Sequence, residues 1–543
     1  MNTQKFEGNI VDLIHGKIFK GRLEVENGKI KSVEKDDNIK ADTHILPGLI
    51  DSHIHIESSM LIPSEFARLA VTHGTVATVS DPHEIANVLG IDGIKYMIKN
   101  GKSVPFKFYF GASSCVPATP FETAGNKIGI EELEELLSMD EIKYLSEMMN
   151  FLGVINRDDF EMQKLAVANK YGKPADGHAP GVKGEAAKKY IEAGISTDHE
   201  CFTMEEALEK IKYGMKIQIR EGSAAKNFEA LAGLIGSHPD KVLFCSDDKH
   251  PDDLMDGHIN DMYKRAINKG YDPIKVLQSI VLNPIKHYKL DVGILREKDD
   301  ADFIIVDNLK DFNIKSTFVK GNEVYDGQQT TFESVNANTP NLFVAEEINK
   351  SQLEVSYTTD KLKVIKAFDG ELITDTMEVK PFVVDGKVVS DQKNDILKIV
   401  VLNRYGKSEP AIGFINGFNF KEGAIASSVA HDSHNIVAVG TNDDDITKAI
   451  NKVIENKGGV VAISKKGSKV LALPVAGLMS NNDAKEVAVK YRSIDKMAHE
   501  MGSTLRAPFM TLSFMALLVI PNLKLSDKGL FDGNNFSFTP LFN

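Results

Sequence analysis

Short apolar segments alternate with amphipathic helical segments in the first half of this chain, and this alternation restricts the possible folds more than any other feature. About eight such units fit between residues 49 and 290, and eight units over roughly 240 residues are typical of a (β/α)₈ barrel. The alternative is a doubly wound parallel sheet, but no Gly-x-Gly-x-x-Gly motif opens any of the helical segments. The first strand is expected to end at His53, and the other seven are expected at GTVATVS (from Gly74), FKFYFGA (from Phe106), YLSEMMNF (from Tyr144), KPADGH (from Lys173), GISTDH (from Gly194), MKIQIRE (from Met215) and KVLFCSDD (from Lys241).

Shorter strand-like segments flank the barrel region on both sides. Residues 1–48 and 291–333 both contain short apolar segments separated by turns, so we predict that they form one small, β-sandwich-like domain beside the barrel at residues 49–290. A polar linker, SVNANTPN, begins at Ser334. Residues 342–543 mix strand segments such as LKIVVLNR with a helical segment, DDDITKAINKVIENKG, which predicts a separate α+β domain.

Charge and cysteine content argue against several classes of function. The net charge of −13 argues against nucleic acid as a partner. The longest apolar run, FMTLSFMALLVI from Phe509, is too short to span a bilayer, so it predicts a buried helix or strand and no membrane association. Cys115, Cys201 and Cys245 are far apart and odd in number, so no disulfide framework is expected and a cytoplasmic location fits best.

Histidines and carboxylates occur where several of the predicted strands end. In a (β/α)₈ barrel these ends share one face, and that face carries the chemistry. A single residue of this kind is more often a core histidine or a helix-capping aspartate, but six of them at one face indicate a metal centre. The candidate ligands are His53, His55, Glu147, His178, His199 and Asp247.

The residue types restrict the metal and its chemistry. Imidazole and carboxylate ligands suit Zn²⁺, Mn²⁺ or Fe²⁺. Six ligands exceed what one catalytic ion needs, so we expect two ions with a carboxylate between them. A bound divalent ion lowers the pKa of water to about 7 and thereby provides hydroxide at neutral pH. Asp247 is the candidate for accepting the water proton and delivering it to a leaving group.

These segments resemble the amidohydrolase superfamily of metal-dependent hydrolases and, more narrowly, its adenine deaminases. The superfamily resemblance rests on PGLIDSHIHIE, HAPG, TDHE and DADFIIVDN. The narrower one rests on HIESSM, SDPHEIANVLG, SEMMNFLGVI, ADGHAPG, STDHE, CSDDKHPDDL, AHDSHNI and PVAGLMS, and it extends over nearly the whole chain. It implies a small-molecule substrate, adenine, which is hydrolysed to hypoxanthine and ammonia in purine salvage. It also implies a homodimer or a larger homo-oligomer.

The resemblance further implies how the ligands are shared between two ions. It assigns one ion to His53, His55 and Asp247, the other to His178 and His199, and the bridging position to Glu147. Many superfamily members bridge with a carboxylated lysine on the fourth strand, but Lys143 stands at the start of that strand here. Because Glu147 occupies the bridging position, a deaminase is favoured over ring-opening hydrolases. The resemblance favours Mn²⁺ or Fe²⁺, and Zn²⁺ also suits these ligands.

Adenine deamination implies attack of hydroxide at C6 and delivery of a proton to N1. Glu84 is the first candidate donor, and its alternative role is that of a carboxylate favoured by a helix N-terminus. Glu200 is the second candidate, although strand alternation points its side chain away from His199. His83 is expected to contact a metal or the substrate, or to be a simple loop residue.

Two further segments have more than one interpretation. Arg220 and Glu221 end the seventh strand, where an ion pair is favoured over binding of the purine edge. His431 belongs to the run HDSH and is a candidate substrate contact from a lid that closes over the barrel mouth. Turn chemistry is the favoured interpretation of that run.

Two other functions remain open from the sequence. One is cyclic-amide hydrolysis on the same metal scaffold, as in hydantoinases and dihydroorotases. The other is a non-catalytic, metal-bearing scaffold whose C-terminal domain recruits partners, but the presence of every candidate ligand argues against it.

Overall fold

Eight parallel strands close into a barrel in the computed structural model, which describes residues 3–40 and 42–543. The strands are β5 (Leu49–Ile54), β6 (Thr75–Ser80), β7 (Lys107–Ala112), β8 (Ile142–Met148), β9 (Ala175–Gly177), β10 (Thr197–Asp198), β11 (Lys216–Arg220) and β12 (Val242–Cys245). Strands β5–β9 and β10–β12 form two parallel sheets. Backbone bridges join Ala175 to Ile195 and Ile54 to Asp247, and these bridges close the barrel. The predicted barrel and its eight strands are confirmed.

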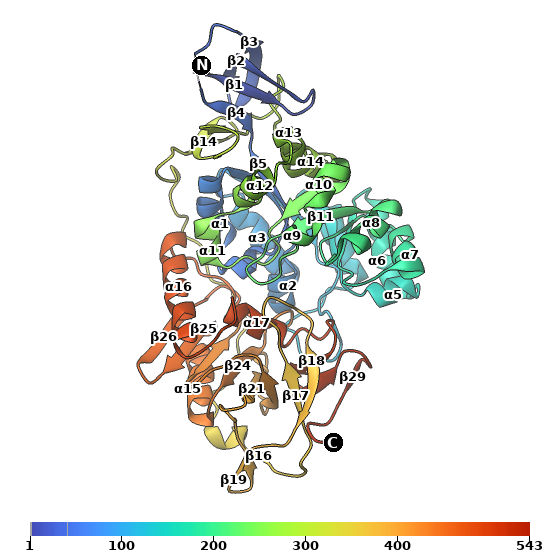
Figure 1. The fold of residues 1–543 in the computed structure, drawn as a ribbon, viewed down its shortest axis with the longest axis vertical. Coiled ribbons are helices and arrows are strands. Elements are labelled where there is room, and N and C mark those ends of the chain that lie inside the picture. Colours follow the sequence, from blue (N-terminus) through green and yellow to red (C-terminus); the bar gives the residue numbers. More distant parts are fainter. Residues whose placement is uncertain (1–2, 41) are drawn as a thin grey trace.

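Helices connect successive barrel strands and cover the outside of the barrel (Figure 1). They include α1 (Pro63–Ala70), α2 (His83–Leu89), α3 (Ile91–Gly101), α4 (Ile130–Ser138), α5 (Phe151–Ile155), α6 (Asp159–Lys170), α7 (Gly184–Glu192), α8 (Met204–Lys212), α9 (Phe228–Leu231), α10 (Gly233–Ser237), α11 (Pro251–Asp256), α12 (Ile259–Asn268), α13 (Pro273–Leu277) and α14 (Asn283–Tyr288). Helix α8 illustrates why they form. The Thr203 hydroxyl caps its N-terminus by accepting the N–H of Glu206 at 3.3 Å, and Ala207 and Ile211, one turn apart, are buried.

The two flanks of the barrel build one seven-stranded sheet, which lies at the top of Figure 1. The N-terminal flank supplies β1 (Thr3–Asp12), β2 (Lys17–Glu26), β3 (Lys29–Lys35) and β4 (His44–Pro47), and the C-terminal flank supplies β13 (Phe303–Val306), β14 (Ile314–Val319) and β15 (Asn322–Tyr325). Strand β4 joins the two halves because it pairs with β1 on one side and with β13 on the other. Both flanks therefore contribute strands to one sheet; residues 1, 2 and 41 of the predicted range lie outside the described residues.

Gly48 connects this sheet to the first barrel strand at a point where no side chain fits. A Cβ atom at residue 48 would lie 2.3 Å from Cγ1 of Val76. We therefore expect Gly48→Ala to lower the free energy of unfolding by about 1–3 kcal/mol through overpacking. Chemical denaturation of the variant measures this. Gly406→Ala is the matched control, because an added Cβ there has no neighbour within 4 Å; equal stabilities of the two variants would contradict the packing argument.

The C-terminal domain contains an eight-stranded sheet, in the order β18-β17-β22-β21-β24-β23-β25-β26. These strands are β17 (Leu362–Lys366), β18 (Asp375–Val379), β21 (Leu397–Leu402), β22 (Ala411–Asn416), β23 (Ala424–Ser427), β24 (Ile436–Gly440), β25 (Gly459–Ser464) and β26 (Gly467–Ala472). The helices α15 (Asp443–Glu455), α16 (Ala484–Glu500) and α17 (Pro508–Phe514) accompany them, and α17 accounts for the start of the buried apolar run near Phe509. Small sheets add β16 (Val355–Ser356), β19 (Val383–Val384), β20 (Lys387–Val388), β27 (Leu523–Ser526), β28 (Gly529–Asp532) and β29 (Ser537–Phe538).

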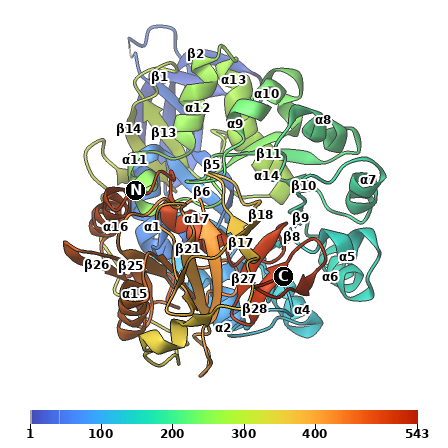
Figure 2. The same ribbon diagram turned by 60° about the horizontal axis from the view of Figure 1, so that its bottom comes forward.

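This domain packs against the barrel, in front of its strands in Figure 2. The Asn435 side chain donates a hydrogen bond to the backbone oxygen of Thr123 at 2.9 Å, and Tyr491 Oη lies 2.6 Å from Nδ1 of His250. Within the described ranges, no helix has both the length and the apolar character needed to cross a membrane. The three cysteines are buried free thiols.

Candidate active site

The six candidate metal ligands lie together at the C-terminal ends of the barrel strands, and all are buried. They are His53 in β5, Glu147 in β8, and His55, His178, His199 and Asp247, which follow β5, β9, β10 and β12 within one or two residues. Parallel barrel strands all end on the same face, so ligands far apart in the sequence meet there.

The first group of ligands contains His53, His55 and Asp247. The Nε2 atoms of the two imidazoles are 3.3 Å apart. Oδ1 of Asp247 lies 3.5 Å from Nε2 of His53 and 3.1 Å from Nε2 of His55. The backbone fixes this arrangement. The N–H of Asp247 donates to the oxygen of His53 at 2.9 Å, and the N–H of His55 donates to the oxygen of Asp247 at 3.1 Å.

The second group contains His178, His199 and Glu147. Oε2 of Glu147 is 3.1 Å from Nδ1 of His178 and 3.1 Å from Nε2 of His199. Its other oxygen, Oε1, is 3.6 Å from Nε2 of His55. Glu147 therefore connects the two groups. Ligand atoms of His53, Glu147 and His199 also lie within 4.8 Å of one another, a spacing that suits a shared ion.

The charges of the buried carboxylates also fit bound cations. Burial raises the pKa of Glu147, but the imidazoles of His178 and His199 outweigh it and hold this pKa well below its usual range. Burial likewise raises the pKa of Asp247, and Arg220 is the main group that outweighs it, so this pKa also lies well below its usual range. Both shifts favour the ionised carboxylate. With the surrounding imidazoles they form a donor set that divalent transition metals prefer.

Arg220 is the cation that faces Asp247. Its Nη1 donates to Oδ2 of Asp247 at 2.6 Å and also to Glu200, while Nη2 lies 3.2 Å from Oε2 of Glu200. Glu221 instead pairs with Arg265 at 2.5 Å. Both residues at the end of the seventh strand therefore form ion pairs. Arg220 and Glu221 do not pair with each other: Arg220 pairs with Asp247 and Glu200, and Glu221 pairs with Arg265.

The expectation that Glu200 points away from His199 is wrong. Strand β10 ends at Asp198, so strand alternation does not extend to the next two residues. The N–H of Glu200 donates to Oδ1 of Asp198 at 3.2 Å. Oε1 of Glu200 lies 3.4 Å from Nε2 of His199 and 3.7 Å from Nδ1 of His178, so this carboxylate faces the second ligand group.

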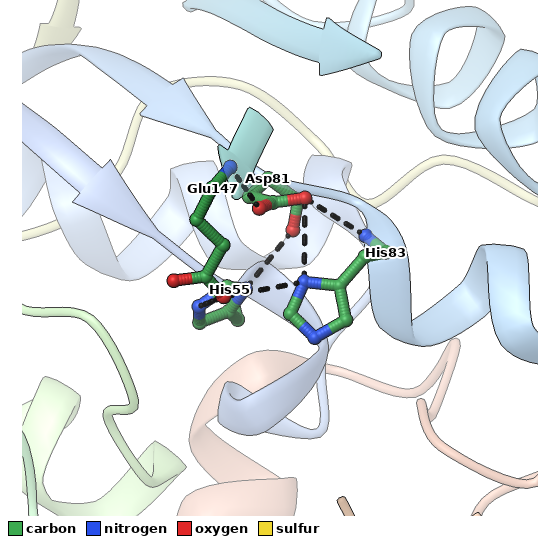
Figure 3. A group of neighbouring side chains, drawn as sticks. All are labelled: His55, Asp81, His83 and Glu147. Atoms are coloured by element: carbon green, nitrogen blue, oxygen red, sulfur yellow. Dashed lines mark hydrogen bonds and ion pairs between the residues drawn. The ribbon is translucent and has the colours of Figure 1, made fainter. Parts of the chain in front are cut away.

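His83 lies next to the ligands and is held by Asp81 (Figure 3). Oδ1 of Asp81 accepts the backbone N–H of His83 at 3.1 Å, and its Oδ2 accepts the backbone N–H of Glu147 at 3.3 Å. The backbone oxygen of Asp81 is 3.2 Å from Nδ1 of His55. Asp81 therefore orients three site residues. It was not among the predicted site residues, although its place directly after β6 was a usable signal.

Glu84 belongs to a second polar cluster beside the ligands. Ser58 Oγ lies 3.1 Å from Oε1 of Glu84 and 2.5 Å from Oδ1 of Asp248. His431 Nδ1 is 3.1 Å from Oε1 of Glu84, and its Nε2 is 3.7 Å from Oδ1 of Asp248. Burial raises the pKa of Glu84, so this carboxyl group holds a proton more readily than an exposed one. Sequence reasoning missed Ser58 and Asp248, although both are close neighbours of candidate ligands.

The C-terminal domain closes the pocket over these residues. Its contribution to the lining consists of Leu372, His431, Asp432, Phe514 and Leu517. Oδ1 of Asp432 is 3.5 Å from Nε2 of His83. The HDSH run forms a turn, with the N–H of His434 donating to the oxygen of Ala430 at 2.7 Å, and this turn also places His431 in the pocket lining, so both interpretations of the run describe the structure.

Lys143 is remote from this pocket. It lies near the start of β8, where it lines a cleft with Lys107 and Asp291, whereas Glu147 lies near the end of the same strand. The fourth strand therefore presents Glu147, and no lysine, to the ligand groups.

Comparison with known proteins identifies the family. The model of the amidohydrolase family matches residues 44–324, and that of the adenine deaminase C-terminal domain matches residues 371–537. An adenine deaminase of Sulfurovum sp. (strain NBC37-1) is 55% identical over 98% of this chain and 99% of its own length. Adenine deaminases of Methanosarcina barkeri and Borreliella burgdorferi are 50% and 46% identical, each over 99% of this chain and over 99% and 100% of their own lengths. This chain belongs to the adenine deaminase family.

Both matched regions of this adenine deaminase family member build the pocket. The six candidate ligands lie in the amidohydrolase region, and His431, Asp432 and Phe514 lie in the C-terminal region. Membership of the amidohydrolases implies a divalent metal, and the geometry of the ligand groups agrees with that.

Proposed function

We propose that this protein hydrolyses adenine to hypoxanthine and ammonia. The observation that carries the proposal is the position of Glu147, whose two oxygens face both ligand groups at the barrel mouth. Asp247 and Glu84 supply two carboxyl groups with opposite pKa shifts in the same site, and such a pair suits proton transfer in both directions. The relatives named adenine deaminase support adenine as the substrate.

The proposed metal centre holds two divalent ions. The ligands would be His53, His55 and Asp247 for one ion, His178 and His199 for the other, and Glu147 between them. Mn²⁺ or Fe²⁺ are the proposed ions, and Zn²⁺ also suits the same ligands. When bound, a divalent ion lowers the pKa of water and so provides the nucleophile near neutral pH.

The protein's own carboxyl groups then move the protons. Ionised Asp247, which Arg220 holds in place, accepts a proton from the attacking water and passes it to the departing amine. Glu84 donates a proton to N1 of the purine and recovers one from the new hydroxyl group. The C6–O bond forms, the C6–N bond breaks, and ammonia leaves. The closing residues of the C-terminal domain exclude bulk water from these steps.

The proposed setting is purine salvage in the cytoplasm. Three buried free thiols suit a reducing compartment. A homodimer or larger homo-oligomer is proposed from the family resemblance.

Metal removal is the direct test of this function. Protein loaded with Mn²⁺ is expected to release ammonia from adenine, and a chelator is expected to lower the rate by about 100-fold or more, because the nucleophile then lacks its activating ion. Adding Mn²⁺ back should restore the rate. Ammonia release, measured together with the metal content, follows each step, and His53→Ala is the variant control.

Two outcomes would contradict the proposal. If metal-loaded wild-type protein and His53→Ala are equally inert toward adenine, adenine deamination fails. If the wild type opens a hydantoin or dihydropyrimidine ring but leaves adenine unchanged, cyclic-amide hydrolysis replaces it.

A further inference from the structure

Three apolar side chains of the C-terminal domain, Leu372, Phe514 and Leu517, form a roof over the candidate active site. The pocket beneath them has a volume of about 20 Å³. That volume holds about one water molecule, whereas pockets for small ligands usually have roughly 300–1,000 Å³. A purine therefore enters only when the roof moves away from the barrel mouth, and the roof must return to the same position to exclude water.

The roof comes from two separate segments of the chain. Leu372 lies in the loop between β17 and β18, and Phe514 is the last residue of α17. Lys524, in β27, lies between these segments and is fully buried. Its Nζ donates to the backbone oxygen of Leu372 at 2.6 Å and to that of Phe514 at 3.1 Å. One side chain thus joins both halves of the roof.

The chemistry of Lys524 fits this bridging role. Both of its partners are carbonyl groups and neither is a carboxylate, and burial lowers the pKa of Lys524 to about 7. A neutral amine still has two N–H donors, which is the number of carbonyl groups that it faces. Burying a lysine costs desolvation free energy that burying a methionine of similar length does not. What a lysine adds at this position, and a methionine cannot, is the two hydrogen bonds.

The backbone of β27 also forms hydrogen bonds to the same two segments, independently of the lysine side chain. The Thr374 hydroxyl donates to the oxygen of Leu523 at 2.9 Å, and the N–H of Leu525 donates to the oxygen of Met515 at 3.0 Å. Strand β27 therefore stays attached to both segments when the amine is removed, and Lys524 adds the link next to the pocket.

We propose that Lys524 is a positioning residue for the deamination reaction, which joins Leu372 and Phe514 so that the roof closes over the purine as one body. This inference rests on the proposed function. Lys524 touches neither ligand group, so its effect is on how well the closed pocket forms around the substrate and not on the chemical step.

Lys524→Met is the test variant, because it keeps the length and removes both donors. The KM for adenine is expected to rise about tenfold while kcat changes less than about twofold, because the roof then closes less firmly over bound substrate but is still closed in most of the complex. Hydrogen exchange at the amides of Thr374 and Met515 is expected to become faster. This second readout needs no activity, so it tests the roof even if adenine is not the substrate.

Lys398→Met is the matched control. Lys398 is a buried lysine of the same domain, and its Nζ donates to the oxygen of Leu353 at 2.6 Å and pairs with Asp443 at 2.5 Å, away from the roof. This variant is expected to lose stability but to keep the wild-type KM and the wild-type exchange at Thr374.

Equal changes of KM in the two lysine variants, or unchanged KM and exchange in Lys524→Met, would overturn the proposal. If Lys524→Met does not fold, Thr374→Val tests the same connection, because it removes the hydroxyl that binds β27 and keeps the lysine. It is expected to raise KM in the same direction, and an unchanged KM would count against the roof as one body.

Discussion

A Glu147→Gln variant is expected to lose its divalent metal and, with it, on the order of 10⁴-fold or more of the rate of adenine deamination. The amide has the same shape but carries no charge, and its nitrogen cannot coordinate an ion as a carboxylate oxygen does. Glu147 is within 3.6 Å of His55, His178 and His199, so this substitution disturbs both ligand groups directly. Metal content per protein, measured beside ammonia release, reports the two losses separately.

The control for this variant lies at the other end of the same strand. Glu141 directly precedes β8 and forms an ion pair with Lys102 at 2.5 Å on the surface. Glu141→Gln is expected to keep full metal content and activity, because exposed ion pairs contribute little to stability. A Glu147→Gln protein that retains two ions and near-wild-type turnover would refute the bridging assignment.

Residues on barrel strands were the most predictable part of the structure. His53 and His55 are two positions apart in and after a buried strand, so alternation places both on one face, and Glu147 lies near the end of β8. Most of the eight strands are recognisable as short apolar segments, although β9 and β10 are short and partly polar, and in a barrel the strand ends meet at one face. In a regular strand, the position of a residue in the sequence determines the face to which its side chain points, so these side-chain positions follow from the sequence.

Prediction failed where the regular strand had already ended. Glu200 faces the pocket because β10 contains only two residues, and no periodicity in the sequence marks that early end. Asp81 contacts His83 through its side chain and His55 through its backbone oxygen. Every residue type has a backbone oxygen, so the sequence does not show which residue forms such a contact.

The three apolar residues of the roof were not predicted from the sequence, in which only His431 was a candidate lid contact. Leu372 and Phe514 are ordinary apolar residues whose position over the pocket results from packing of the C-terminal domain against the barrel. His431 reaches Glu84 for the same reason. Contacts between domains depend on their relative placement, which no local pattern encodes.

Asp247→Asn is expected to lower kcat for adenine by about 10³-fold, an effect within the range of a lost general acid–base group. The amide cannot accept the water proton and deliver it to the departing amine. Arg220 also loses one of its two carboxylate partners and keeps Glu200, so the melting temperature is expected to fall without loss of the fold. Steady-state ammonia release and thermal denaturation measure the two effects.

The decisive comparison is between metal content and turnover in the Asp247→Asn protein. His178, His199 and Glu147 remain intact, so at least one ion is expected to stay bound, and excess Mn²⁺ is expected to refill the other position without restoring the rate. Recovery of turnover in proportion to added Mn²⁺ would show that Asp247 is only a ligand and not a proton carrier. Asp256→Asn is the matched control, because Asp256 pairs with Arg492 at 2.7 Å on the surface and its loss should leave kcat unchanged.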